Sequence, residues 1–163
     1  MKPILILFAG MILLFLPYFS FAVNASGSLE YRVVIREPHT HYFEVEIILK
    51  NPQAKHVDLK LPVWTPGSYL VREYAANVEG FQAVDLNDNT SLNFTKLNKS
   101  TWRVALKTGS DIAIRYRVYA FAGNTRMSYL DEEHAFIMAN TLLMYTDELR
   151  STSSIFNDFT AID

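Results

Sequence analysis

The sequence contains no cysteine among its 163 residues and only six glycines. Without cysteine, the chain has no disulfide, no lipid-modified cysteine and no cysteine nucleophile. The glycine-flanked serine of many hydrolases, the glycine-rich phosphate loop and the EF-hand pattern are also missing. The formal net charge of −2 provides no basic surface for nucleic acid. These absences exclude several enzyme classes and predict no nucleic-acid partner.

The first 25 residues have the organisation of a secretory signal peptide. Lys2 precedes an apolar run at 4–16, which is followed by Pro17 and small residues. Cleavage is predicted after Ala22 or Ala25. An uncleaved membrane anchor is the alternative, although the run is short for a span of about 20 residues. We therefore expect an exported protein, periplasmic or extracellular, that contacts a membrane only transiently through this segment.

Residues 26–146 show the alternation of apolar and polar side chains that is typical of half-buried strands. Phe43, Val45 and Ile47, for example, alternate with Glu44 and Glu46. Short strands with turns about every ten residues predict an all-β domain, either an antiparallel β-sandwich or a curved, saddle-like sheet. The first three strands are expected to form an antiparallel meander. Strands are predicted at 29–36, 41–50, 57–61, 78–84, 92–96, 101–107 and 112–120.

Three stretches have weaker patterns. Residues 73–78 could form a helical turn, but they lack a clear apolar face and are predicted to be extended and irregular. Residues 135–145 form a continuous apolar run, which fits either a buried strand pair or a short helix. Residues 147–163 are polar and weakly patterned, and we expect them to form a tail or the beginning of a further domain.

The motif LPVWTPGSYL follows the third predicted strand. Pro62 and Pro66 fix φ and remove two backbone donors, so no regular strand passes through both. Gly67 marks a turn at which positive φ is expected. Trp64 and Tyr69 add large rings with polar groups. The motif predicts a rigid corner of a β-domain, and the alternative is a rigid loop presented to a partner.

Two groups of residues are candidates for chemistry. His39 and His41 form an H-x-H pair, but a metal site would need further ligands from elsewhere, and exposed or hydrogen-bonded histidines are the alternative. Residues 131–134 place carboxylates beside His134 in an order that differs from H-E-x-x-H, and a solvated loop is the alternative there. Neither group forms a complete catalytic site.

The corner motif, with the Val71 and Arg72 that follow it, resembles the N-terminal domain of the glycyl aminopeptidase family. These are zinc metallopeptidases of the thermolysin-like class that often carry a PDZ domain. Residues 99–104 resemble the family's K-x-T-W-x-V strand, and residues 114–120 resemble its Y-x-V-Y-A strand. Residues 130–136 resemble the segment that ends this domain. The similarity covers about residues 29–146.

In this family a helical catalytic domain follows, and its H-E-x-x-H helix supplies two zinc ligands and a general base. The sequence ends before any such helix. The resemblance therefore implies zinc for the full-length family, no cofactor in this chain, and a chain that is inactive alone. The expected partner is a catalytic metallopeptidase domain, missing or in another chain, and a peptide substrate binds only with that domain. The chain is interpreted as a truncated member, a gene fragment, or a domain whose partner is separate.

The resemblance also implies positions for the site residues. The β-domain is expected to pack on the catalytic domain and to wall the cleft that holds the substrate's amino terminus. The residues expected to stabilise the domain or its docking surface are Trp64, Pro66, Gly67 and Tyr69. Those expected at the cleft rim are Glu132, Glu133 and Asn140. Around Asn140 the family is expected to have a Phe-Asn-Gly run, whereas this sequence has Ala-Asn-Thr. The alternative is a free-standing exported β-sandwich that binds a protein or peptide through residues 64–69.

Overall fold

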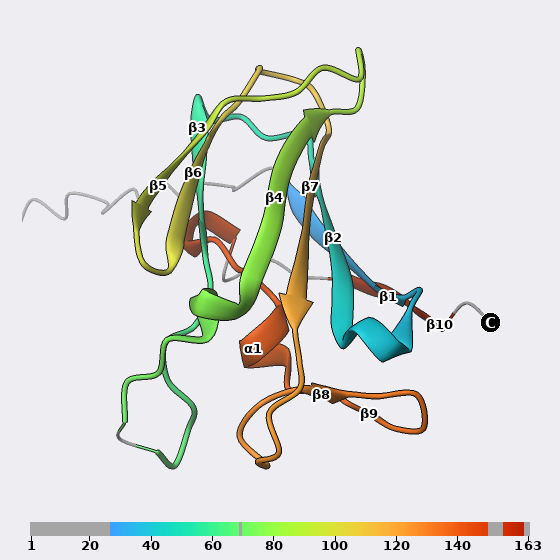
Figure 1. Ribbon diagram of the computed structural model, residues 1–163. Helices are drawn as coiled ribbons and strands as arrows, with labels where there is room; N and C mark the ends of the chain where they lie inside the picture. The colour runs from blue at the N-terminus through green and yellow to red at the C-terminus, as the bar shows by residue number, and fades with distance from the viewer. Residues whose placement is uncertain (1–26, 69, 150–154, 162–163) are drawn as a thin grey trace, which may run out of the picture.

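The computed structural model describes residues 27–68, 70–149 and 155–161 (Figure 1). The predicted signal peptide at 1–25 and Tyr69 lie outside the described residues. No helix in the described part of the chain has the length and apolar character needed to cross a membrane. The strands are β1 (Ser28–Ile35), β2 (Tyr42–Lys50), β3 (His56–Lys60), β4 (Val78–Asp85), β5 (Phe94–Asn98), β6 (Thr101–Ala105), β7 (Ile112–Tyr119), β8 (Tyr129–Leu130), β9 (Ala135–Phe136) and β10 (Ile155–Ala161). The helical segments are η1 (Pro38–Thr40), η2 (Tyr74–Asn77), α1 (Ala139–Leu142) and η3 (Asp147–Leu149).

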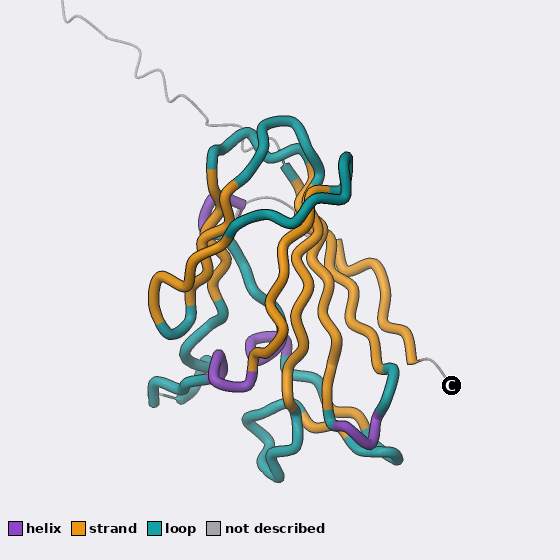
Figure 2. Tube along the Cα trace, turned by 45° about the horizontal axis from the view of Figure 1, so that its top comes forward, coloured by secondary structure: helices purple, strands orange, loops and turns teal. Residues whose placement is uncertain are grey.

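The strands form two main sheets. The larger has the order β10-β1-β2-β7-β4, the smaller has the order β3-β6-β5, and β8 pairs with β9. The two main sheets converge at one end and diverge towards the other, where helical segments lie between them (Figure 2). All pairs are antiparallel except β1 with β10. The predicted all-β class, with a sandwich-like or saddle-like form, is confirmed.

The core fills the space between the two main sheets. The alternating residues predicted to face inward are buried along β1, β2, β3 and β7, because successive side chains of a strand point to opposite faces. Phe43 and Ile47 on β2 have no exposed surface, and neither has Leu59 on β3. The aromatic residues Phe81, Trp102 and Tyr116 stack between the sheets. The core therefore joins both sheets into one domain.

The predicted meander of the first three strands is wrong in its third member. β1 pairs with β2, but the other edge of β2 pairs with β7, from Tyr42 opposite Tyr119 to Leu49 opposite Ile112. β3 pairs with β6 in the smaller sheet. Asn51 adopts a positive φ of 42° at the end of β2, and the chain leaves the larger sheet there. The short connection between β2 and β3 does not make them neighbours in a sheet, because β7, a longer strand later in the sequence, pairs with β2 instead.

Two other local predictions are corrected or completed by the structure. Residues 74–77 form η2 and are not extended, because Tyr74 and Ala75 are buried and tertiary packing holds this turn. The apolar run at 135–145 divides into the short strand β9 and the one-turn helix α1. No strand was predicted at 155–161, where β10 pairs in parallel with β1.

Candidate functional site: the Trp-Pro-Gly corner

The corner begins where β3 ends. Lys60 and Tyr145 exchange two backbone hydrogen bonds of 2.8 and 2.9 Å, and the side chain of Leu61 is buried. The amide of Ser68 then donates to the carbonyl of Thr65 across 3.0 Å, which closes a turn. Gly67 has φ +83°, as predicted for this position. The proline–glycine sequence therefore forms a hydrogen-bonded turn that is fixed at its base.

Thr65 connects the corner to two other elements. Its Oγ1 lies 2.6 Å from the hydroxyl of Tyr74 in η2, and it accepts a hydrogen bond of 2.8 Å from Nδ2 of Asn140 in α1. Tyr74 is only 1% exposed, so its hydroxyl depends on this contact. The Thr65 hydroxyl thus holds three segments that are far apart in the sequence.

Large apolar side chains of the corner remain on the surface. Trp64 is 56% exposed, and Leu70 and Val71 are also exposed. The amide of Arg72 donates to the carbonyl of Val63 across 2.7 Å, so the two ends of the corner are joined. Exposed apolar groups on a braced loop are typical of a surface that contacts another molecule. The rigid corner and the presented loop are therefore compatible descriptions of the same segment.

A pocket of about 420 Å³ lies beside the corner. Pro62, Trp64 and Pro66 line one part of it, and Asn140 and Tyr145 line another. The structure thus brings together two groups of residues that the sequence placed apart, the corner motif and Asn140. Because the Nδ2 group of Asn140 donates to Thr65, the orientation of its amide is fixed.

Tyr31 completes the apolar side of this pocket. Its hydroxyl donates to the carbonyl of Met144 across 2.8 Å, and burial raises the pKa of Tyr31 to about 12. Burial also raises the pKa of Tyr116, whose hydroxyl donates to the carbonyl of Leu142. Both phenols stay protonated at neutral pH and act as structural donors to the segment that follows α1.

Glu132 and Glu133 lie in the turn between β8 and β9, where both are exposed. Neither lines the pocket that contains Asn140. The organising residue of this turn is Asp131, which accepts the hydroxyl of Tyr129 and the amides of Glu133 and His134. These hydrogen bonds hold the pKa of Asp131 below its usual range. The sequence reasoning overlooked this Asx-type turn, although an aspartate at its first position is a known signal.

Comparison with known proteins identifies the domain. Residues 30–156 match the family model described as the Peptidase M61 N-terminal domain. The chain belongs to this family. The match confirms the resemblance drawn from the corner motif, and it covers every residue of the pocket except Leu29. No curated protein matches the chain.

Two solved structures resemble the M61 N-terminal domain. One is an aminopeptidase N family protein from Idiomarina loihiensis, with 25% identity and a TM-score of 0.68 over 74% of this chain. The other is the E323A mutant of an M1 zinc metallopeptidase from Deinococcus radiodurans, with 10% identity and a TM-score of 0.35 over 70% of this chain. The chain covers 20% and 28% of these two proteins. It therefore spans a small part of the length of each.

One histidine of the pair, His41, has a structural role in this M61 domain. Nδ1 of His41 lies 2.7 Å from the carbonyl of Leu130, and the ring stacks on Phe121. Within the described ranges, no three His, Asp or Glu side chains are grouped so that they could hold a metal ion. His41 is thus a hydrogen-bonded structural residue, as the alternative interpretation proposed.

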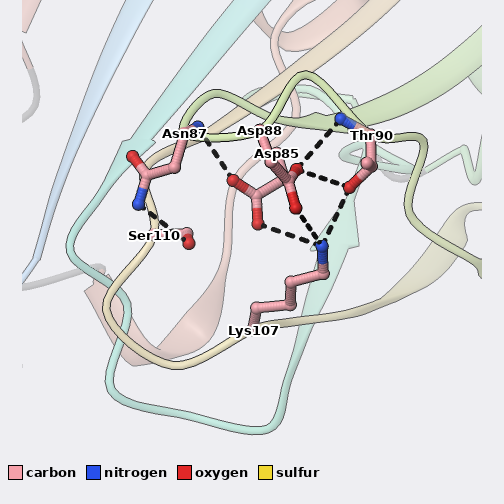
Figure 3. Close-up of polar contacts among 6 residues, drawn as sticks. All are labelled: Asp85, Asn87, Asp88, Thr90, Lys107 and Ser110. Carbon is pink, nitrogen blue, oxygen red and sulfur yellow. Dashed lines mark hydrogen bonds and ion pairs between the residues drawn. The ribbon is translucent and has the colours of Figure 1, made fainter.

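A polar cluster at the end of β4 was not predicted from the sequence (Figure 3). Asp85 is buried, and one of its carboxylate oxygens accepts the amide of Asn87 across 2.9 Å. Lys107 donates to Asp88 across 2.7 Å and to Thr90 across 2.9 Å. The lysine ammonium is thus surrounded by oxygen atoms of one loop, and its positive charge offsets the negative charge of the loop's carboxylates.

Proposed function

We propose that this chain is the non-catalytic N-terminal β-domain of a zinc metallo-aminopeptidase of the glycyl aminopeptidase type. The observation that carries the proposal is the match of residues 30–156 to the Peptidase M61 N-terminal domain. The solved aminopeptidase N family protein, of which the chain covers one fifth, supports it. In this proposal the domain packs on a catalytic domain and helps to shape the substrate cleft.

The side chains of the pocket suit a supporting role. Asn140 offers an amide, and Trp64 with the two prolines offers an apolar wall. An amide orients a substrate by hydrogen bonding, but it does not exchange a proton near neutral pH. The pocket is therefore suited to positioning a ligand, and its lining among the described residues contains no imidazole, amine or carboxylate that could act as a general base.

The described residues do not fit zinc. His41, the better placed imidazole of the H-x-H pair, already contacts a backbone carbonyl, and Asp131 is used in its own turn. Zinc sites in proteins need three or four nitrogen, sulfur or carboxylate ligands around one point. In this proposal the zinc belongs to the catalytic domain, and this chain is inactive alone.

The corner is the part of the domain that we assign to docking. Trp64, Leu70 and Val71 are exposed on a loop that Thr65 braces from beneath. A rigid apolar surface loses little conformational entropy on association. In the same proposal Asn140, Glu132 and Glu133 face the substrate cleft. The pocket that Asn140 shares with Trp64 and Pro66 supports this position for Asn140.

Peptidase assays on separated domains test this proposal. The purified chain, the catalytic domain of a full-length M61 relative and an equimolar mixture are each incubated with zinc and a glycyl anilide substrate. We expect no hydrolysis by the chain alone and faster hydrolysis by the mixture than by the catalytic domain alone. Hydrolysis by the chain alone would overturn the non-catalytic role. A mixture that is no faster, with no binding between the two domains, would favour a free-standing binding module that uses the same exposed corner.

We also propose that the protein is exported, on the evidence of its first 25 residues. A fusion of residues 1–25 to a reporter that works only outside the cytoplasm tests this. Replacement of Leu13 and Leu14 by lysine should abolish the signal, since it interrupts the apolar run. A reporter that stays in the cytoplasm with the natural segment would contradict export.

A further inference from the structure

The outer face of the five-stranded sheet carries charged residues in cross-strand register. Arg32 on β1 lies opposite Glu46 on β2, and Glu46 lies opposite Arg115 on β7. Gln82 on β4 lies opposite Arg115 and continues the row. Nε of Arg115 donates to Glu46 across 2.7 Å, whereas Nη1 of Arg32 is 3.7 Å from the same carboxylate. One carboxylate thus serves two guanidinium groups.

A second row runs beside the first. Glu44 on β2 lies opposite Arg117 on β7, and Arg117 lies opposite Glu79 on β4. Nη2 of Arg117 donates to Glu79 across 2.8 Å, and its guanidinium carbon is 4.4 Å from the ring centre of Tyr42. Arg36, just after β1, donates through Nε to Glu44 across 2.7 Å. The two rows together hold four arginines and three glutamates.

The arginines of this face use few of their donors on other described residues. Arg36, Arg115 and Arg117 each give one hydrogen bond to a carboxylate. By contrast, Arg103 on the smaller sheet donates through both Nε and Nη2 to Asp58, each across 2.7 Å. A guanidinium group has five N–H donors arranged to match a carboxylate. The glutamates therefore orient the arginines of the larger sheet, and within the described residues most of the arginine donors are left for another acceptor.

These arginines surround a hollow of about 630 Å³, which Gly80 and Gln82 also line. The hollow lies at a β-bulge, where the register between β4 and β7 shifts between Glu79 and Gln82. Gly80 has φ +62° at this bulge, and a Cβ placed on it would meet nothing within 4 Å. The bulge and the missing side chain keep the hollow open above β7.

We propose that this hollow binds an extended acidic peptide segment, with carboxylates at every second residue. Arg115 and Arg117 are two residues apart on one strand, so their side chains emerge on the same face about 7 Å apart. An extended peptide presents alternate side chains at the same spacing. The lining of the hollow holds four arginines and two glutamates, which supplies the charge complementarity, and the N–H groups that make no hydrogen bond to other described residues supply the hydrogen bonds. This inference does not depend on a catalytic domain.

Fluorescence anisotropy with labelled heptapeptides tests the proposal on the full chain. The three peptides are ETETETE, the regrouped isomer TEEEETT and the neutral QTQTQTQ. We expect the alternating acidic peptide to bind about tenfold or more tightly than the neutral one and measurably more tightly than the regrouped one. Equal binding of the acidic and neutral peptides would overturn the proposal. Equal binding of the two acidic peptides would overturn the matched spacing.

Two variants locate the site. One carries both Arg115→Gln and Arg117→Gln, and the other, Arg103→Gln on the smaller sheet, is the control. We expect the double variant to lose about tenfold or more in affinity for ETETETE and the control to bind normally. Normal binding by a folded double variant would overturn the assignment. If the double variant does not fold, titration of the natural chain with inorganic phosphate decides. Phosphate that displaces the peptide only at far higher concentration supports a peptide site, and phosphate that binds as tightly as the peptide contradicts it.

Discussion

Nζ of Lys107 lies 3.7 Å from Oδ2 of Asp85, a carboxylate that is 1% exposed. The other oxygen of Asp85 accepts the amide of Asn87, and Oδ2 has no hydrogen bond among the described residues. The lysine is therefore the counter-charge for a buried acid. Removing the partner of a buried charge lowers the stability of the fold much more than removing one member of an exposed ion pair of the same geometry.

Replacement of Lys107 by methionine should accordingly lower the urea midpoint of unfolding more than Lys99→Met does. Lys99 pairs with Glu73 on the surface, where both side chains are largely exposed. Adding Asp85→Asn to Lys107→Met should recover part of the loss, because the uncompensated charge is then absent. Equal midpoints for the two lysine variants would show that Asp85 does not depend on Lys107.

Thr65→Val should destabilise the domain by about 1–3 kcal/mol, because it leaves the buried hydroxyl of Tyr74 without its partner. Tyr74→Phe removes the same hydrogen bond without leaving a buried hydroxyl unpaired. Its cost should be smaller, about 0.5–1.5 kcal/mol. Urea unfolding of both variants measures the difference. A Tyr74→Phe variant that is less stable than Thr65→Val would contradict this account of the hydroxyl pair.

Gly67→Ala should cost about 1 kcal/mol, since alanine is disfavoured at φ +83°. Gly123→Ala is the matched control, because a Cβ at either glycine meets nothing within 4 Å and only Gly67 has positive φ. The control should leave stability within a few tenths of a kcal/mol or raise it. A similar loss in both variants would mean that the turn does not require the left-handed conformation.

In a full-length relative, alanine at the counterpart of Asn140 should lower kcat/KM for a glycyl substrate by about tenfold or more, since one oriented hydrogen bond to the substrate is lost. The counterpart of Thr65→Val should lower kcat/KM by a smaller factor, because it retains the amide but removes the acceptor that fixes its orientation. We expect that variant to lose stability as well. Unchanged kinetics in the Asn140 variant would remove Asn140 from the cleft.

Acid should weaken the fold partly through Asp88. Its hydrogen bonds with Lys107 and Thr90 lower its pKa from 3.8 to about 2 in the folded chain. A carboxyl whose pKa is lower in the folded state stabilises the fold above its unfolded pKa. This contribution is lost as the pH falls from about 5 to about 2. Asp88→Asn should therefore show a smaller loss of stability between pH 6 and pH 3, as measured by urea unfolding. An identical pH dependence in both proteins would contradict the pKa shift.

The sequence predicted local burial well and long-range pairing less well. The alternation of Phe43, Val45 and Ile47 with glutamates identified the buried face of β2, because a strand has a fixed side-chain period. The same pattern carried no information on whether β2 would pair with β3 or with β7. The neighbour of a strand depends on non-local matching, which becomes visible only in the folded chain.

The candidate site shows the same division. Pro62, Pro66 and Gly67 predicted the turn, because their backbone preferences are local. The contact between Thr65 and Asn140 spans 75 residues, and no local signal connects the two. The roles of Asp131 and Asp85 were not predicted, because the first depends on loop amides and the second on burial. The corner was thus predictable as a shape, and its partners were not.

The parallel pairing of β10 with β1 has a consequence for the order in which the domain is completed. Glu30 lies opposite Ile155, so the first strand acquires its last neighbour only after almost the whole domain has been synthesised. Until then the backbone donors and acceptors along the outer edge of β1 are open to any other extended chain. Pairings of such large sequence separation form slowly. A nascent chain of this domain is therefore most exposed to wrong partners at its own N-terminal strand, and the segment 155–161 ends that exposure.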